Sequence, residues 1–482
     1  PLIYTWLIEL ENYHSTSRLE KKASKWDSLN EAKTVESSLR SLLILSSKAY
    51  PEYVNNYLDH LLSSNRLIKK YFCQIIQHSE NISTLSPEKL YAISTVALLE
   101  ELPKERLERW LMEEEEHRIE FEKRPEPITE QDKFEHQLMS GSGIPPDFGS
   151  ITSGKLSISS SYDHRTNGFY PISPLKEPFH SLFEHQPDLA INLVHLITNH
   201  AIKAWLDIVK MESKVAIPIV LNFPWGEQTL WGDKLHYKWS NGHHAPMPIS
   251  CGLMAMKSWA FNFIAKGANI DDVLQKIIQG SHSFSILAIA TAISLEFDHI
   301  SPISVALISC SHLWMPEFEK MNDRQANLIG LNNPIDKAHR DAVQKLNRLK
   351  SSSKNMSDLF FQVWQRNNIL FSEELCRNIY NFKDNPPYFY EHEKNDLKLK
   401  ADNTLLYNQF SELGNRDNYR FNTDPTTPNQ IQIEFYNPLA DTDEVRSQNE
   451  KLSFISNTFT LLLCVKETIE KNRLHHSLTL DL

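Results

Sequence analysis

Glycine is scarce in this sequence, at 13 of 482 residues. Soluble proteins average about 7% glycine. Phosphate-binding loops, Rossmann turns and tight hairpins consume glycine because their backbones need positive φ or close approach to a ligand. The shortage therefore argues against a nucleotide-binding α/β fold. A chain that is instead rich in Leu, Ile, Ser, Glu and Lys is typical of helices.

Cysteine motifs, long apolar runs and a basic charge balance are also missing. The five cysteines are far apart and form neither a CxxC pair nor a disulfide framework, which is typical of a reducing cytoplasm. No run of about 18 apolar residues is present, so we expect no membrane span. A net charge of −11 creates no overall field that attracts nucleic acid. Because the chain starts at Pro1 without a signal-peptide pattern, we expect it to be part of a longer polypeptide.

Apolar residues at helical spacing dominate what is present. The stripe Tyr53, Val54, Tyr57, Leu58 and Leu61 is one of several with steps of three and four. Short helices need neighbours to cover their apolar faces. The sequence therefore predicts a mainly α fold of stacked antiparallel helix pairs, similar to an α-solenoid, without a recognisable repeat class. A small β excursion is expected near residues 215–240, where β-branched residues gather.

Composition divides the chain into four predicted parts. Residues 1–124 form an N-terminal helical domain, and the Pro-, Gly- and Ser-rich residues 125–180 form a linker or irregular connection. Residues 181–330 form a central helical domain that carries the β excursion, with a helix at 284–296 that is apolar nearly all round and should be buried. Residues 331–482 form a more polar helical region with loop-rich residues 381–430, a short strand near 431–435 and a closing helix at 442–472.

Three short patterns resemble catalytic motifs and fail on their context. Residues 149–155 (GSITSGK) match the letters of a phosphate loop, but no strand precedes them and no amphipathic helix follows. Residues 339–341 (HRD) resemble a kinase catalytic loop but lie in a predicted helix. Asp188, Glu212 and Lys214 resemble a metal-dependent nuclease pattern, although Asp188 starts a helix and should cap it.

Metal-ligand spacing is absent from the sequence as well. The 20 histidines form neither HExxH nor HxH. His195 and His200, five residues apart, do not share a helical face. We therefore expect no cofactor and no metal in this segment. Lys345, Arg348 and Lys350, with Lys354, form a small basic stripe that favours either a solvated helix end or a phosphate contact.

An aromatic cluster is the main candidate for partner binding. Tryptophan and tyrosine dominate interface hot spots, and they also fill cores, so both roles stay open at this point. The candidate residues are Trp225, Trp231, Tyr237, Trp239, His243 and His244.

Residues 243–296 resemble a helical region of large bacterial STAND-like P-loop NTPases of anti-phage defence. That region combines a tryptophan-bearing helix, a glycine and a helix with an "LL..S.S.A" pattern, and the corresponding residues here are Trp259, Gly267, Leu274 and residues 281–283. The resemblance extends over about residues 240–480. It implies a cytoplasmic sensor or scaffold that couples detection of an invader to oligomerisation or to an effector. ATP and Mg²⁺ would belong to the parent protein, and no ATPase residue has a counterpart here.

These observations favour a non-catalytic recognition and assembly segment of a larger bacterial protein. We expect a protein partner and self-association, leave nucleic acid open, and expect no membrane. The alternative is a nuclease or hydrolase whose site is assembled only in three dimensions.

Overall fold

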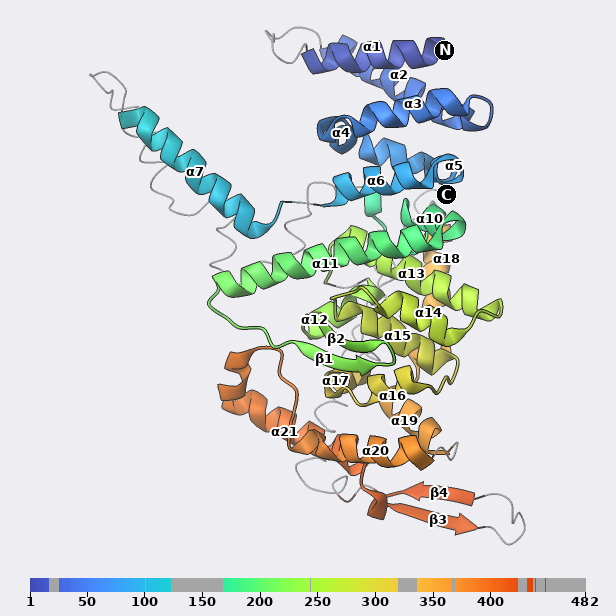
Figure 1. Cartoon of the computed structure of the whole chain (residues 1–482), viewed down its shortest axis with the longest axis vertical. Coiled ribbons are helices and arrows are strands. Elements are labelled where there is room, and N and C mark those ends of the chain that lie inside the picture. The colour runs from blue at the N-terminus through green and yellow to red at the C-terminus, as the bar shows by residue number, and fades with distance from the viewer. Residues whose placement is uncertain are drawn as a thin grey trace, which may run out of the picture. The chain divides into compact units, whose positions relative to one another are not determined.

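The computed structural model describes residues 1–16, 26–99, 101–122, 168–242, 244–319, 336–365, 369–423 and 431–436, with the single residues 438 and 447. Over this part of the chain the fold is mainly α, as predicted, with two small two-stranded antiparallel sheets (Figure 1). None of the described helices is both long and apolar enough to span a membrane. The expected linker at 125–180 falls largely on residues outside the described ones, as do residues 149–155 and the helix at 442–472.

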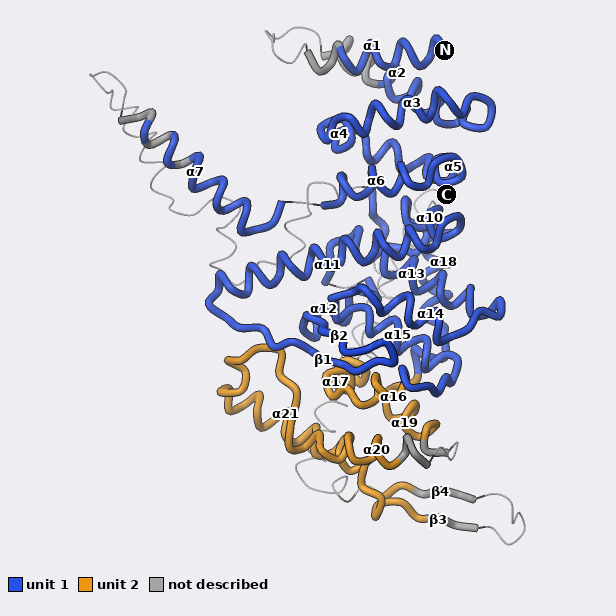
Figure 2. The backbone as a smooth tube through the Cα atoms, in the orientation of Figure 1, with its two compact units in different colours: residues 1–303, 325–353 blue, residues 304–324, 354–482 orange. Residues whose placement is uncertain are grey.

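Contacts divide the chain into two compact units, which Figure 2 shows in different colours. Unit 1 comprises residues 1–303 and 325–353, and unit 2 comprises residues 304–324 and 354–482. The four-part division by composition stays a prediction beside these two units.

Unit 1 contains most of the helices and one hairpin. Its α-helices are α1 (Leu2–Thr16), α2 (Trp26–Leu45), α3 (Pro51–Leu62), α4 (Asn65–Ile75), α5 (Ser79–Leu85), α6 (Pro87–Leu98), α7 (Pro103–Glu122), α10 (Phe179–His185), α11 (Pro187–Met211), α12 (Lys234–Tyr237), α13 (Met247–Ala265), α14 (Ile270–Ile278), α15 (Ser285–Glu296) and α18 (Lys337–Asn347). Its other elements are the short helices η2 (Ser46–Lys48), η3 (Ile76–His78), η5 (Lys238–Asn241) and η9 (Lys350–Ser352) and the strands β1 (Ile219–Phe223) and β2 (Gly226–Leu230).

Helices that follow one another in sequence pack as pairs in unit 1. The pairs are α1 with α2, α3 with α4, α5 with α6, α10 with α11 and α14 with α15. The pair α10/α11 also packs on α5 and α6 and on α13, so that one pair covers the next. The stacking of helix pairs that the apolar spacing predicts is therefore observed in this unit (Figure 1).

The helix α15 of unit 1 is buried on all sides. Every residue from Ser285 to Leu295 is buried, as expected for a helix that is apolar nearly all round. It is enclosed by α12, α13, α14, η5 and η9. The neighbouring α14 begins at a side-chain cap, because the Asn269 side chain accepts hydrogen bonds from the backbone N–H groups of Asp271 (2.8 Å) and Asp272 (3.2 Å).

Unit 2 is smaller and has an aromatic core. Its elements are α16 (Pro302–Ile308, which starts in unit 1), α17 (Ser311–Glu319), α19 (Met356–Gln365), α20 (Ile369–Tyr380), η10 (Asn381–Lys383), η11 (Glu391–Asn395), α21 (Leu397–Glu412), η12 (Arg416–Asn418), β3 (Tyr419–Thr423) and β4 (Ile431–Phe435). The ring of Trp314 lies 5.7 Å from that of Phe382 and 5.2 Å from that of Phe410. The hydroxyl of Tyr407 donates to the carbonyl of Ser311 at 3.0 Å, which ties α21 to α17.

The C-terminal half of the sequence confirms one expectation and corrects another. The strand expected near 431–435 is β4, and it pairs antiparallel with β3. The loop-rich assignment of residues 381–430 is wrong, because α21 runs through it for 16 residues. The buried face of α21 includes the polar Asn403 and Ser411 beside Tyr407, so the helix lacks the apolar stripe that marks a helix in a sequence.

Candidate functional site

Two of the proposed aromatic contact residues are core residues. Tyr237 and Trp239 are each 1% exposed. The Tyr237 ring packs 5.4 Å from the ring of Phe284, and the indole N–H of Trp239 donates to the carbonyl of His244 at 3.1 Å. Of the two roles left open for these side chains, packing is therefore the one observed, and neither can contact a partner in this conformation.

The rest of the aromatic cluster lies closer to the surface. Trp225 and Trp231 are half-buried, His244 is exposed, and His243 lies outside the described residues. Trp225 stacks on Phe223 at 4.8 Å, and the backbone of Trp231 pairs with the segment around Ser283. Only the exposed parts of these side chains remain available as contacts.

A buried histidine packs against two of the tryptophans in this part of unit 1. His236 is buried, and its ring lies 4.8 Å from that of Trp205 and 4.5 Å from that of Trp239. Its Nδ1 lies 2.8 Å from Oδ1 of Asp233, which also caps α12. Its Nε2 has no hydrogen-bond partner among the described residues. Trp205 and Trp239 therefore pack around a histidine within the core.

The nuclease pattern is separated by the helix that joins its residues. Asp188 lies in the first turn of α11 and not at its cap, and Glu212 follows its last residue. At 1.5 Å per residue the helix holds them about 35 Å apart. Asp188 pairs with Lys276 and Glu212 with Lys214, each at 2.8 Å. These residues cannot share a metal ion. Over the described part of the chain, no three His, Cys, Asp or Glu side chains group as metal ligands.

The residues of the other patterns have packing roles in unit 1. His339 of the HRD triplet lies on α18, and its Nδ1 is 2.9 Å from the hydroxyl of Ser173. Lys345 of the basic stripe donates to Asn262 at 3.3 Å. Trp259 stacks between Phe183 and Phe263, at 5.5 and 5.3 Å.

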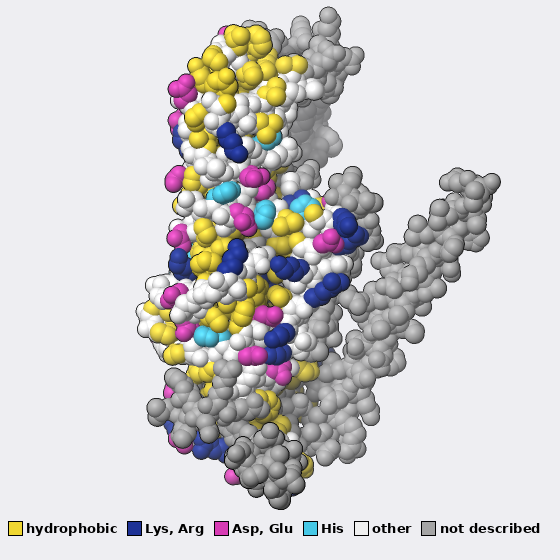
Figure 3. Space-filling model, turned by 90° about the vertical axis from the view of Figure 1, so that its right-hand side faces the viewer, with side chains coloured by type: hydrophobic (Ala, Val, Ile, Leu, Met, Phe, Trp, Pro, Cys, Tyr) yellow, Lys and Arg dark blue, Asp and Glu magenta, His cyan; other side chains and the backbone are white. Residues whose placement is uncertain are grey.

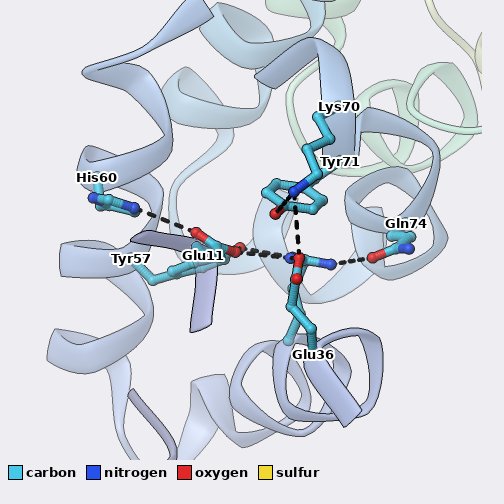
Figure 4. Close-up of polar contacts among 8 residues, drawn as sticks. Glu11, Glu36, Tyr57, His60, Lys70, Tyr71 and Gln74 are labelled. Carbon is cyan, nitrogen blue, oxygen red and sulfur yellow. Dashed lines mark hydrogen bonds and ion pairs between the residues drawn. The ribbon is translucent and has the colours of Figure 1, made fainter. Parts of the chain in front are cut away.

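A buried polar network connects α1, α2, α3 and α4 (Figure 4). Arg40, on α2, is 1% exposed and lies at its centre. Its Nη2 donates to Oε1 of Glu11 and to Oε1 of Glu36, and its Nε donates to the hydroxyl of Tyr57, each at 2.7 Å. Its Nη1 donates to Oε1 of Gln74. One guanidinium group therefore joins all four helices.

The surroundings of Arg40 hold it in the charged form. The guanidinium lies 3.6 Å from the centre of the Tyr71 ring, a cation–π contact. Burial disfavours the charge, but the carboxylates of Glu11 and Glu36 raise the pKa of Arg40 on balance. Burial also raises the pKa of Tyr57. The hydroxyl of Tyr57 therefore stays protonated and donates to Oε1 of Glu11 at 2.8 Å.

The face of α2 that points away from the Arg40 network is apolar and exposed. Val35, Leu42 and Leu45 are each more than half exposed, and Ser38 is exposed between them. The inner face, with Glu36, Arg40, Leu43 and Ile44, is buried. We call Val35, Ser38, Leu42 and Leu45 the outer stripe of α2. On α1, Leu2 and Trp6 are also more than half exposed, and Figure 3 shows apolar side chains gathered over these first helices.

The spacing of the outer stripe is visible in the sequence. Residues 35, 38, 42 and 45 are separated by three, four and three positions, which is the a/d spacing of a coiled-coil seam. The pair Glu36 and Arg40, four residues apart, predicts an ion pair on one helix but not its burial. Neither a protein-family model nor a curated protein matches the chain.

Proposed function

We propose that this chain is a recognition and assembly segment that works by binding, and that two copies associate through the outer stripe of α2. One observation carries the proposal: α2 has a buried face and, opposite it, exposed apolar residues at coiled-coil spacing. A stripe of this kind pairs with another helix by inserting its side chains between those of the partner. The stripe has no charged residue, so an identical copy can face it without like-charge repulsion.

Exposure gives this association its driving force. Leu42 is 53% exposed and Leu45 is 55% exposed. Covering the exposed part of each side chain contributes roughly 1 kcal/mol, and Val35, Leu2 and Trp6 add similar amounts where they are also covered. Such a contact is more stable if α2 is already held in place before binding, because ordering a mobile helix on binding costs free energy. The Arg40 network holds α2 in place by joining it to α1, α3 and α4.

The test is the mass of the full chain in solution, with and without a charge in the outer stripe. By light scattering after size exclusion we expect a dimer at tens of micromolar. A Leu42→Glu/Leu45→Glu double variant should be a monomer, because two carboxylates would have to lose water within an apolar contact. We expect its dimer dissociation constant to rise by at least about a hundredfold, which is roughly 3 kcal/mol.

A matched control separates this effect from a general effect of added charge. Val215 is also apolar and more than half exposed, but lies outside α1 and α2. Val215→Glu should leave the dimer unchanged, and circular dichroism should show all variants folded. A wild-type monomer at these concentrations, or a dimer that survives the double substitution, would refute self-association through α2.

The resemblance to defence NTPases suggests a larger protein in which this association would take place. In that setting the parent protein would use the segment to sense an invader component and to bring effector modules together. A partner that favours the assembled form would shift the equilibrium by its differential affinity for that form. The alternative of a nuclease or hydrolase gains no support from Asp188 and Glu212, because they lie at opposite ends of α11.

A further inference from the structure

A pocket of about 370 Å³ opens on unit 2, where the chain after α21 crosses α20. Its wall on α20 is formed by Glu373, Cys376, Arg377 and Tyr380, which lie on adjacent turns of the helix. Its opposite wall is formed by residues 414–416. A volume of this size is in the range of small-molecule sites.

Gly414 allows the two walls to meet. A Cβ atom at this position would lie 2.3 Å from the carbonyl oxygen of Cys376 and 2.6 Å from the backbone nitrogen of Tyr380. Both distances are shorter than any contact that a carbon atom tolerates, so only glycine brings this turn onto α20. The close approach places Asn415 and Arg416 beside the side chains of the helix.

The charges lining this pocket are mostly positive. Arg377 has no hydrogen bond or ion pair among the described residues, and its side chain is exposed. Arg416 has one carboxylate partner, Glu373, at a long 3.4 Å between Nη1 and Oε1. Glu373 is the one acid that lines the pocket in the described part of unit 2. A third cation, the ammonium group of Lys383, lies 3.4 Å from the centre of the Tyr380 ring.

We propose that this pocket binds the phosphate group of a small phosphorylated molecule, held between Arg377 and Arg416. The planar guanidinium group presents paired N–H donors that fit two phosphate oxygens, and such charge-assisted bonds are stronger than neutral ones. A dianionic phosphate would replace Glu373 as the partner of Arg416 and would give Arg377 a partner. The hydroxyl and ring edge of Tyr380 would then adjoin the organic part of the molecule.

The small size of the pocket favours a small molecule over a nucleic-acid strand. A strand is bound by cations that follow its backbone over several nucleotides, with rings on which bases stack. Here the two guanidinium groups share one pocket, and the chain as a whole carries a net charge of −11. A single phosphate group matches this arrangement.

The test is calorimetric titration of the full chain with inorganic phosphate and, separately, with adenosine monophosphate. Saturable binding is expected for the nucleotide, with a dissociation constant that rises about tenfold in Arg377→Gln and in Arg416→Gln. Glu373→Gln should act in the opposite direction and tighten binding severalfold, because it frees Arg416 and removes a like charge from the pocket. Arg66→Gln is the matched control, since Arg66 is an exposed arginine on α4 in unit 1.

Comparing the nucleotide with inorganic phosphate shows which part of the molecule the pocket recognises. If the nucleotide binds more tightly than inorganic phosphate and Tyr380→Ala removes the difference, the site also recognises the organic part. If the two bind equally, it recognises the phosphate alone. The proposal is overturned if neither ligand saturates, if Arg66→Gln weakens binding as much as the pocket variants, or if only single-stranded RNA binds. It is also overturned if Arg377→Gln lowers the melting temperature without changing affinity, because Arg377 would then serve only the end of α20.

Discussion

At the scale of single residues, the Arg40 network is the most demanding arrangement in unit 1. Two carboxylates and a guanidinium lose most of their water when α1 to α4 pack, and each loss is unfavourable. The network persists because the guanidinium donates four hydrogen bonds, to Glu11, Glu36, Tyr57 and Gln74, and has an aromatic ring over its plane. The two buried carboxylates of this network therefore depend on the charge of Arg40.

Removing the charge of Arg40 should therefore destabilise unit 1 strongly. Arg40→Met keeps most of the side-chain volume but removes the guanidinium that pairs with Glu11 and Glu36 at 2.7 Å. The carboxylates keep more distant basic groups, with His60 3.3 Å from Glu11 and Lys70 4.0 Å from Glu36. We expect a loss of about 3–5 kcal/mol in the free energy of unfolding, measured by urea denaturation. The triple variant Arg40→Met/Glu11→Gln/Glu36→Gln should lose less, because no buried charge is left unpaired. A loss under about 1 kcal/mol for Arg40→Met alone would mean that water solvates the carboxylates.

Single residues also mark where reading the sequence succeeds. Asn269 is predicted as a cap because a short polar side chain precedes an apolar helical stripe, and capping depends only on neighbours in the sequence. Ser86 fits the same pattern before Pro87, yet its hydroxyl donates to Asn55 and caps nothing. The burial of Arg40 depends on α1, α3 and α4, which lie outside any local window, so local spacing could not predict it.

At the scale of elements, α14 shows how a short helix holds its place. Its buried face carries Val273, Leu274 and Ile277, while Asn269 satisfies two backbone N–H groups at its start. Asn269→Ala should cost about 1 kcal/mol in the free energy of unfolding, because those groups lose their acceptor. Asn269→Asp should retain stability, since its carboxylate can accept both bonds. Equal stability of all three proteins in urea would show that water replaces the cap.

Some helices and strands can be predicted from the sequence pattern of their own residues, and others cannot. The buried helix α15 is evident because its residues are apolar on all sides, and β4 because Ile431 and Ile433 alternate with polar residues. The helix α21 is not evident in the sequence, because its buried face includes the polar residues Asn403 and Ser411. Hydrogen bonds to other segments satisfy both side chains: Asn403 donates to the carbonyl of Pro387, and Ser411 accepts from the backbone N–H of Lys383. The pocket beside α20 likewise depends on Gly414 meeting a helix more than thirty residues earlier.

At the scale of the whole molecule, two units with separate cores should unfold in separable steps. His312 in unit 2 provides the test: its Nε2 donates to the carbonyl of Tyr388 at 3.3 Å, and burial lowers its pKa to about 4. An unfolded histidine titrates near pH 6.5. The neutral form of His312 therefore contributes to the stability of unit 2 in full above about pH 6.5, and this contribution of at most about 3 kcal/mol is lost as the pH falls towards 4.

The measurement is hydrogen exchange in urea. Peptides of unit 2 should lose protection at a lower urea concentration at about pH 5 than at pH 7. His312→Gln, whose amide can still donate to Tyr388, should reduce that difference without moving the peptides of unit 1. If it moves the peptides of both units equally, the two cores unfold as one.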